Sequence, residues 1–267
     1  EHGTQDLLLD SRLSLRAVKI YLDGALGSRG ALLDSPYDDS PKNQGIQIWK
    51  ESEFEELVRL IDSHGFQVAV HAIGNRANEI AVRVFEKVWG EKTKLKRPRI
   101  EHAQVLSEDL IRKMGKLGII ASMQPVHCSS DSSWVVDRIG KKRARFSYPW
   151  RTLLDTQVPL AFGTDSPIED FTPWPGLFSS ISRRSLNLSD ANAFFPEEKI
   201  NLKEALLAFS QGAAYASFQE TMLGSLEPGK WADFFVSDKN LRELLPEELL
   251  KQEVQATYFS GRLVYTK

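Results

Sequence analysis

Residues 68–77 read VAVHAIGNRA, and this stretch decides how the chain is interpreted. A short apolar run ends at His71, and Gly74 follows where a strand gives way to a loop. Runs of the same kind are rich in Val, Ile, Leu or Ala and mostly apolar on both faces, which is typical of parallel strands covered by helices. They predict five buried strands, at residues 16–22, 66–71, 98–102, 118–123 and 159–163.

Amphipathic segments lie between and after these runs. Apolar residues at helical spacing predict helices that begin near Ser52, Ala77, Ser107, Ser147 and Asn201, with Ser52, Ser107 and Asn201 as N-caps. The alternation of strand and helix predicts an α/β protein with a parallel sheet. Residues 166–198 contain four prolines and predict a long loop, which we interpret as a substrate lid because of its length.

Composition narrows the classes of partner. The 267 residues carry a net charge of −2, which gives no electrostatic reason to expect nucleic acid or an anionic membrane surface as a partner. No run approaches the roughly 18 apolar residues of a membrane helix. A single cysteine, Cys128, allows no internal disulfide and favours a reducing, cytoplasmic location. We expect a small-molecule substrate, with further copies of the chain as a partner left open.

Polar residues recur where the predicted strands end. His71, His102 and Asp165 each close a strand, and Lys19 lies late in the first strand. The carboxyl ends of the strands of a parallel α/β barrel open on one face, where the chemistry is done. The interval 102 − 71 = 31 residues fits one strand–helix unit of roughly 30. Two histidines and a carboxylate suit a divalent metal such as zinc.

Each candidate also has a plain structural interpretation. A histidine at a strand end is often a satisfied polar residue, Asp165 fits a Thr-Asp-Ser-Pro turn, and Lys19 fits a protein surface. These interpretations need separate coincidences at four strand ends, so we favour the metal site.

The motifs together resemble a known family. The stretches VKIYLDGALGSRGALLDSPY, VAVHAIGNRA, RIEHAQ, ASMQPVH, LAFGTDSPI and GSLEPGKWADF resemble, in this order, those of the YtcJ-like branch of the amidohydrolase superfamily. The resemblance covers the chain from about Val18 to its end. It implies a metal-dependent (β/α)8 TIM barrel with a small β-sandwich, which hydrolyses amide or related C–N bonds through a metal-activated water.

The resemblance also implies residue roles. Lys19 corresponds to a lysine on the fourth barrel strand that is carboxylated and binds metal. His71 and His102 correspond to the ligands on the fifth and sixth strands, and Asp165 to the ligand and general base on the eighth. The complete enzyme is expected to hold one or two divalent ions, with zinc favoured.

Two further residues are expected near the substrate. They are Asp23, in the DGALGS loop, and His127, in QPVH. Asn75 stands where the family commonly has Asp.

The chain departs from the family in one respect. The family's first strand carries a His-x-His pair, and no such pair occurs here. Only 18 residues precede Lys19, whereas three strand–helix units need roughly 90. We therefore expect the chain to be the C-terminal part of a longer protein, inactive alone. Residues 1–218 are predicted to form barrel strands 4–8, and residues 219–267 part of the sandwich, with a Ser-Gly hairpin.

Two alternatives stay open. One is a noncatalytic metal-binding remnant, because the His-x-His pair is absent. The other is a phosphotriesterase-like barrel hydrolase, which uses a similar ligand set.

Overall fold

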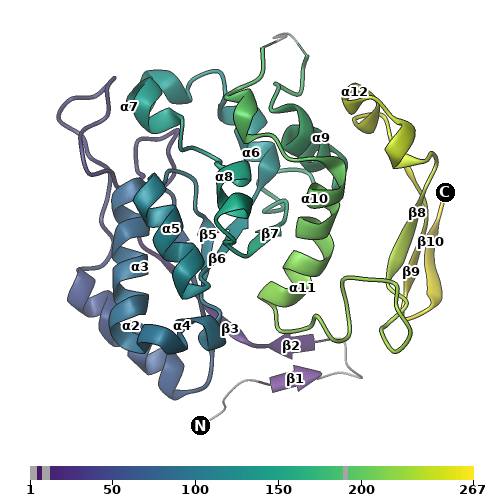
Figure 1. The fold of residues 1–267 in the computed structure, drawn as a ribbon, viewed down its shortest axis with the longest axis horizontal. Helices are drawn as coiled ribbons and strands as arrows, with labels where there is room; N and C mark the ends of the chain where they lie inside the picture. The colour runs from purple at the N-terminus through teal and green to yellow at the C-terminus, as the bar shows by residue number, and fades with distance from the viewer. Residues whose placement is uncertain (1–4, 8–12, 189–191) are drawn as a thin grey trace. The chain divides into compact units, whose positions relative to one another are not determined.

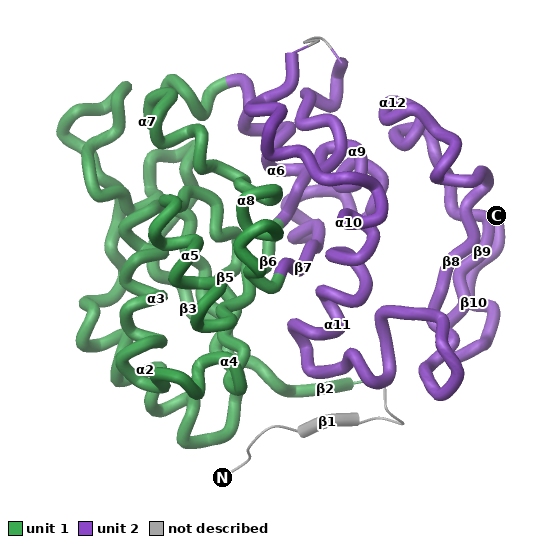
Figure 2. Tube along the Cα trace, in the orientation of Figure 1, with its two compact units in different colours: residues 1–123, 134–159 green, residues 124–133, 160–267 purple. Residues whose placement is uncertain are grey.

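The chain folds into strands and helices that alternate along the sequence. In the computed structural model, residues 5–7, 13–188 and 192–267 are described. They form two compact units: unit 1 comprises residues 1–123 and 134–159, and unit 2 comprises residues 124–133 and 160–267 (Figure 2). Within the described residues, no helix has both the length and the apolar character to cross a membrane.

The core of unit 1 is a parallel sheet. Its strands lie side by side in chain order, with Val18 next to Val68, Val70 next to Ile100 and Ile100 next to Ala121. Four of the predicted strands are thereby confirmed, with bounds β3 (Ala17–Tyr21), β4 (Gln67–Ala72), β5 (Arg99–His102) and β6 (Ile120–Met123). A short antiparallel ribbon of β1 (Gln5–Leu7) and β2 (Leu13–Leu15) precedes them.

Helices cover one face of this sheet (Figure 1). The helices of unit 1 are α2 (Glu51–Ser63), α3 (Asn75–Trp89), α4 (Thr93–Lys96), α5 (Glu108–Leu117), α7 (Val135–Ala144) and α8 (Trp150–Asp155). Helices α2 and α3 pack against β4, and α3 also packs against α5. Phe54 of α2 and Phe85 of α3 are fully buried there, with ring centroids 6.1 Å apart.

The other face of the sheet is polar, which corrects the prediction that both faces are apolar. Successive side chains on a strand point to opposite faces. Val68 and Val70 of β4 therefore face the helices, whereas Gln67 and His71 face away from them. The sequence favoured two apolar faces because the strands are short and their polar residues are few.

The helix starts test the capping predictions. The Leu110 N–H donates to Ser107 Oγ at 3.3 Å, so the predicted cap of α5 is confirmed. The prediction at Ser52 is wrong, because α2 begins at Glu51 and Lys50 is its N-cap. The Glu53 carboxylate accepts the Lys50 N–H at 2.8 Å and satisfies the helix start from within the first turn.

The long segment between β3 and α2 is tied to α7. Asp39 accepts hydrogen bonds from both Arg29 and Arg138, the first at 2.8 Å. Arg143 donates to Asp38 at 2.7 Å, and the Asp38 N–H donates to the Arg138 carbonyl at 2.9 Å. The segment is thus anchored by charged and by neutral contacts together.

Unit 2 contains the fifth predicted strand and most of the C-terminal helices. Its elements are α6 (Pro125–Asp131), β7 (Leu160–Phe162), α9 (Trp174–Ser182), α10 (Leu202–Leu207), a π-helical turn (Ala208–Gly212), α11 (Ala213–Ala216), β8 (Phe234–Ser237), α12 (Pro246–Leu249), β9 (Val254–Phe259) and β10 (Arg262–Thr266). Asn201 caps α10 as predicted, by accepting the Glu204 N–H at 2.9 Å.

The predicted loop at residues 166–198 is only partly irregular. It contains α9, whose Leu177 and Phe178 are buried. The prolines misled the prediction, because Pro175 lies in the first turn of α9, where a missing N–H costs no hydrogen bond.

The C-terminal strands form an antiparallel sheet in the order β10-β9-β8. The hairpin between β9 and β10 turns at Ser260 and Gly261, with φ of 49° and 73°. Positive φ at both positions is the signature of a tight two-residue hairpin, so the predicted Ser-Gly turn is confirmed. The predicted boundary after residue 218, the barrel and the sandwich stay predictions.

Candidate functional site

A layer of polar side chains lies on the face of the unit 1 sheet opposite to Val68 and Val70. Arg99 donates to Glu101 at 2.8 Å on the same strand and to Gln67 at 3.0 Å on the neighbouring strand. These three residues were missed by the sequence analysis. The signal that could have found them is the alternation of Arg99, Ile100 and Glu101, in which two charges flank one apolar residue.

His71 and His102 lie together at the carboxyl ends of β4 and β5. Their ring centroids are 4.5 Å apart, in an edge-to-face arrangement, and the two residues are 8% and 7% exposed. The register places Ala72, not His71, beside His102. Simple alternation would therefore put the two imidazoles on opposite faces.

The backbone at the end of β5 resolves this conflict. His102 and the following Ala103 have φ of 75° and 43°, in the left-handed region that residues with a Cβ rarely adopt. This conformation ends the strand alternation at His102, and the ring meets that of His71. Backbone strain of this kind concentrates at functional sites, where the surroundings enforce it.

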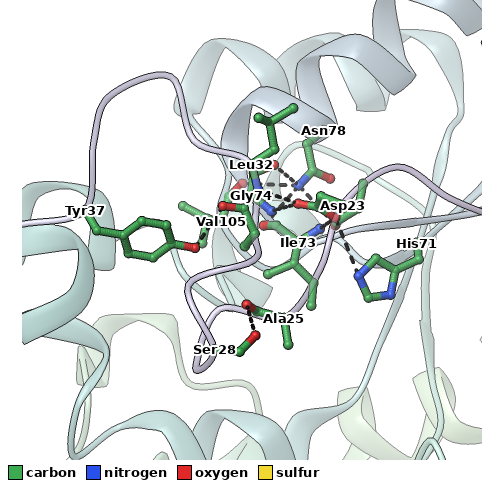
Figure 3. A network of polar contacts seen from close by, with 12 residues as sticks. Asp23, Ala25, Ser28, Leu32, Tyr37, His71, Ile73, Gly74, Asn78 and Val105 are labelled. Carbon is green, nitrogen blue, oxygen red and sulfur yellow. Dashed lines mark hydrogen bonds and ion pairs between the residues drawn. The ribbon is translucent and has the colours of Figure 1, made fainter. Parts of the chain in front are cut away.

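Asp23 lies beside His71, in the first turn after β3 (Figure 3). Its Oδ1 accepts the Ile73 N–H at 3.0 Å, and its Oδ2 accepts those of Gly74 at 2.7 Å and Leu32 at 2.9 Å. Oδ1 also faces His71 Nε2 at 3.5 Å. Burial raises the pKa of Asp23 to about 7, against the opposing effect of the three N–H donors.

The turn that carries these donors is itself fixed. Asn78 Nδ2 donates to the carbonyl oxygens of Gly74 at 2.9 Å and Ala72 at 3.1 Å. Figure 3 shows Asn78 and Gly74 within the same network as Asp23. Gly74 approaches Leu32 so closely that a Cβ atom would lie 1.9 Å from the Leu32 carbonyl oxygen. Only glycine fits there without a backbone shift.

Lys19 lies on the same face of the sheet as His71. It is the neighbour of Ala69 in the register, two residues before His71, and it is exposed. Its Nζ is 5.0 Å from the ring centroid of Tyr21, and that ring is 4.9 Å from the ring of His71. Lys19, His71, His102 and Asp23 thus belong to one region of unit 1.

The other two predicted residues, Asp165 and His127, belong to unit 2 (Figure 2). Asp165 is exposed after β7, with φ of 59°. His127 lies in α6, where burial lowers its pKa, and the nearby carboxylates of Glu169 and Asp165 oppose the shift. Glu169, which the sequence analysis missed, accepts a hydrogen bond from Ser130 of α6 at 3.0 Å.

The chain matches a known protein family over nearly its whole length. The sequence model of the Amidohydrolase family matches residues 4–265. The chain belongs to the amidohydrolase family. The resemblance inferred from the motifs is thereby confirmed.

The proteins that the chain resembles are longer than the chain itself. It is 34% identical to YtcJ of Bacillus subtilis over 251 residues, which are 94% of this chain and 47% of YtcJ. It is 35% identical to LONG AFTER FAR-RED 3 of Arabidopsis thaliana over 260 residues, or 97% of this chain and 44% of that protein. The structure of an uncharacterized metal-dependent hydrolase from Pyrococcus furiosus superposes with a TM-score of 0.74 at 34% identity, covering 86% of this chain and 45% of that one. The chain spans about half the length of the relatives it matches.

The side chains of unit 1 provide some of the ligands that a divalent metal needs. Two buried imidazoles from neighbouring strand ends are suitable ligands for a divalent transition metal. Over residues 5–7, 13–188 and 192–267, no three His, Cys, Asp or Glu side chains form a ligand group. Lys19, which lies on the same face of the sheet as His71, is a further candidate ligand in unit 1.

Proposed function

We propose that this chain contributes the metal-binding core of a metal-dependent hydrolase that acts on amide or other C–N bonds. The observation that carries the proposal is the pair of buried rings of His71 and His102 at adjacent strand ends, 4.5 Å apart. Membership of the amidohydrolase family and the likeness to a metal-dependent hydrolase from Pyrococcus furiosus support it.

In this proposal His71, His102 and Lys19 hold a divalent metal, with zinc favoured. Lys19 would serve as a carbamate, formed when its neutral amine reacts with carbon dioxide, because an ammonium group cannot bind a cation. When bound, the metal polarises the scissile carbonyl and lowers the pKa of water so that a nucleophile is available at neutral pH.

Asp165 is proposed as the metal ligand of unit 2 and as the general base. Its carboxylate would accept a proton from the attacking water and deliver it to the leaving nitrogen, which cannot depart as an amide anion. The exposed position of Asp165 after β7 leaves its carboxylate accessible to substrate.

His127 is proposed to bind the substrate. The lowered pKa of its imidazole keeps the ring neutral at physiological pH, so it can donate or accept a hydrogen bond without carrying charge. Substrate contact by Asp23 stays a prediction, and the 1% exposure of Asp23 counts against it.

The test combines metal content with a substrate panel. The purified protein is stripped with a chelator, reloaded with zinc, and assayed on amides and on phosphotriesters. We expect about one or two bound ions, as in other hydrolytic metal sites, and zinc-dependent release of amine from the amides. Turnover of phosphotriesters alone would identify a phosphotriesterase-like enzyme. Bound zinc without any turnover would identify a noncatalytic metal protein.

A further inference from the structure

The carboxylate of Asp23 is held rigidly. It is 1% exposed, and three backbone N–H groups donate to its two oxygens at 2.7–3.0 Å. These donors come from two chain segments, one at Leu32 and one at the turn after β4. Because both oxygens are engaged from fixed backbone positions, the carboxylate cannot rotate without breaking several bonds.

The same carboxylate faces one particular nitrogen of His71. The distance from Oδ1 to Nε2 is 3.5 Å, and both side chains are buried, at 0% and 10% exposed (Figure 3). A buried carboxylate is costly unless its charge is compensated by hydrogen-bond donors. An imidazole nitrogen that faces a carboxylate is favoured as N–H, and the other ring nitrogen then carries the lone pair.

We infer that Asp23 is a positioning residue that fixes His71 as the Nε2–H tautomer, leaving Nδ1 as the nitrogen that binds the metal of the proposed function. A histidine ligand commonly donates its other N–H to a carboxylate, which fixes the ring orientation and raises the ligand's basicity. The inference rests on the proposed function for the metal, whereas the tautomer follows from the Asp23 geometry alone.

An amide cannot replace this carboxylate. Three backbone N–H groups, from Leu32, Ile73 and Gly74, donate to its two oxygens, and His71 Nε2 lies 3.5 Å from Oδ1. In Asp23→Asn one oxygen becomes an NH2 group, which accepts no hydrogen bond. If the NH2 group takes the Oδ1 position, it faces the Ile73 N–H and the Nε2–H of His71, and neither donor then has an acceptor there. If it takes the Oδ2 position, it opposes Leu32 and Gly74.

The first experiment reads the tautomer in the unsubstituted, metal-free protein. Long-range 1H–15N correlation spectra of protein labelled at histidine distinguish Nε2–H from Nδ1–H, and the His71 signals are those missing from His71→Gln. At a pH above both the usual pKa of imidazole and the raised pKa of Asp23, about 7, the carboxylate is ionised and we expect the Nε2–H tautomer. A Nδ1–H tautomer, or a ring that stays doubly protonated, would overturn the inference.

The second experiment measures zinc affinity by chelator competition. Asp23→Asn should raise the Kd for zinc about 10–100-fold, the usual effect of losing the hydrogen-bond partner of a ligating histidine. Asp34→Asn is the matched control, because it makes the same chemical change at an exposed side chain of the same segment.

The outcomes separate the two proposals. A folded Asp23→Asn variant with native zinc affinity and an unchanged His71 tautomer contradicts the positioning role. If the unsubstituted protein shows the Nε2–H tautomer but binds no zinc, the metal part of the proposed function fails and the Asp23–His71 contact stands. If Asp23→Asn does not fold, the tautomer of the unsubstituted protein decides the question.

Discussion

The ring of His102 meets the ring of His71 at 4.5 Å because the backbone turns left-handed at His102. Neither side chain would reach the other if β5 kept its alternation through its last residue. The fold thus uses one strained backbone position to place two imidazoles at neighbouring strand ends.

The first prediction concerns this pair. His71→Ala and His102→Ala should each remove most of the bound metal. Both imidazoles bind the same ion, so the loss of either one weakens the whole site. Metal per protein, measured by elemental analysis, tests the prediction. His64→Ala is the control, since His64 is an exposed residue at the end of α2. Unchanged metal content in both site variants would remove the basis for a shared ion.

The second prediction concerns Asp165. Asp165→Asn should lower the maximal rate of amide hydrolysis by at least about 10²-fold, the usual loss when a positioned base is removed. The thermal midpoint should hardly change, because the side chain is exposed. Asp170→Asn in the same segment is the control; its remaining oxygen can still accept the Thr172 N–H. Near-native turnover in Asp165→Asn would reduce Asp165 to a turn residue.

The third prediction compares two serines at helix starts. Ser107→Ala should lower the free energy of unfolding by about 1 kcal/mol, because it removes the side-chain cap of α5. Ser52→Ala should leave it unchanged or raise it slightly, because Ser52 lies inside α2, where alanine is the better helix former. Urea denaturation of both variants tests the pair. A larger loss in Ser52→Ala would restore the N-cap predicted from the sequence.

The fourth prediction concerns Gly74. Gly74→Ala should lower the free energy of unfolding by at least about 2 kcal/mol, because the new methyl group would meet the Leu32 carbonyl oxygen, a backbone atom that cannot move alone. Gly163→Ala is the matched control, with no atom within 4 Å of the added Cβ. Equal stability of the two variants would show that the turn after β4 relaxes easily.

The fifth prediction concerns Cys128, which is buried and whose pKa burial raises to about 11. The native thiol should react very slowly with a disulfide reagent at neutral pH and react fully after unfolding in urea. Rapid reaction of the native protein would contradict the buried position.

The raised pKa of Cys128 also fixes the sign of a pH effect on stability. The folded pKa exceeds the unfolded value of 9.0, so the contribution is complete below pH 9 and is lost as the pH rises toward 11. Over that window the free energy of unfolding should fall more steeply in the unsubstituted protein than in Cys128→Ala, by at most about 3 kcal/mol. Parallel slopes in the two proteins would contradict the shift.

Local sequence patterns predicted the five buried strands and the helices α2, α3, α5, α8 and α10, because short apolar runs and helical periodicity are local signals; they did not predict α4, α6, α7, α9 and α12. The predicted cap at Ser52 was wrong, because α2 begins at Glu51. The Glu53 carboxylate accepts the N–H of Lys50, the residue before the helix. Helix α9 was missed because Pro175 reads as a loop signal although it sits in a first helical turn.

The candidate site was predictable only in part. The sequence identified His71 and His102, since each ends an apolar run. It could not show that Asp23 binds Gly74, 51 residues later, because that contact depends on where Leu32 and Gly74 come to lie in the fold. Nor could it show the left-handed backbone at His102, which local residue preferences disfavour.

The ion pairs of Asp39 make the contact between α7 and the segment after β3 sensitive to ionic strength. Arg29 and Arg138 reach Asp39 from partly exposed positions, so added salt screens these attractions. The neutral hydrogen bond from the Asp38 N–H to the Arg138 carbonyl is not weakened in this way. High salt should therefore loosen the segment first around Arg29, three residues before the Leu32 N–H that binds Asp23.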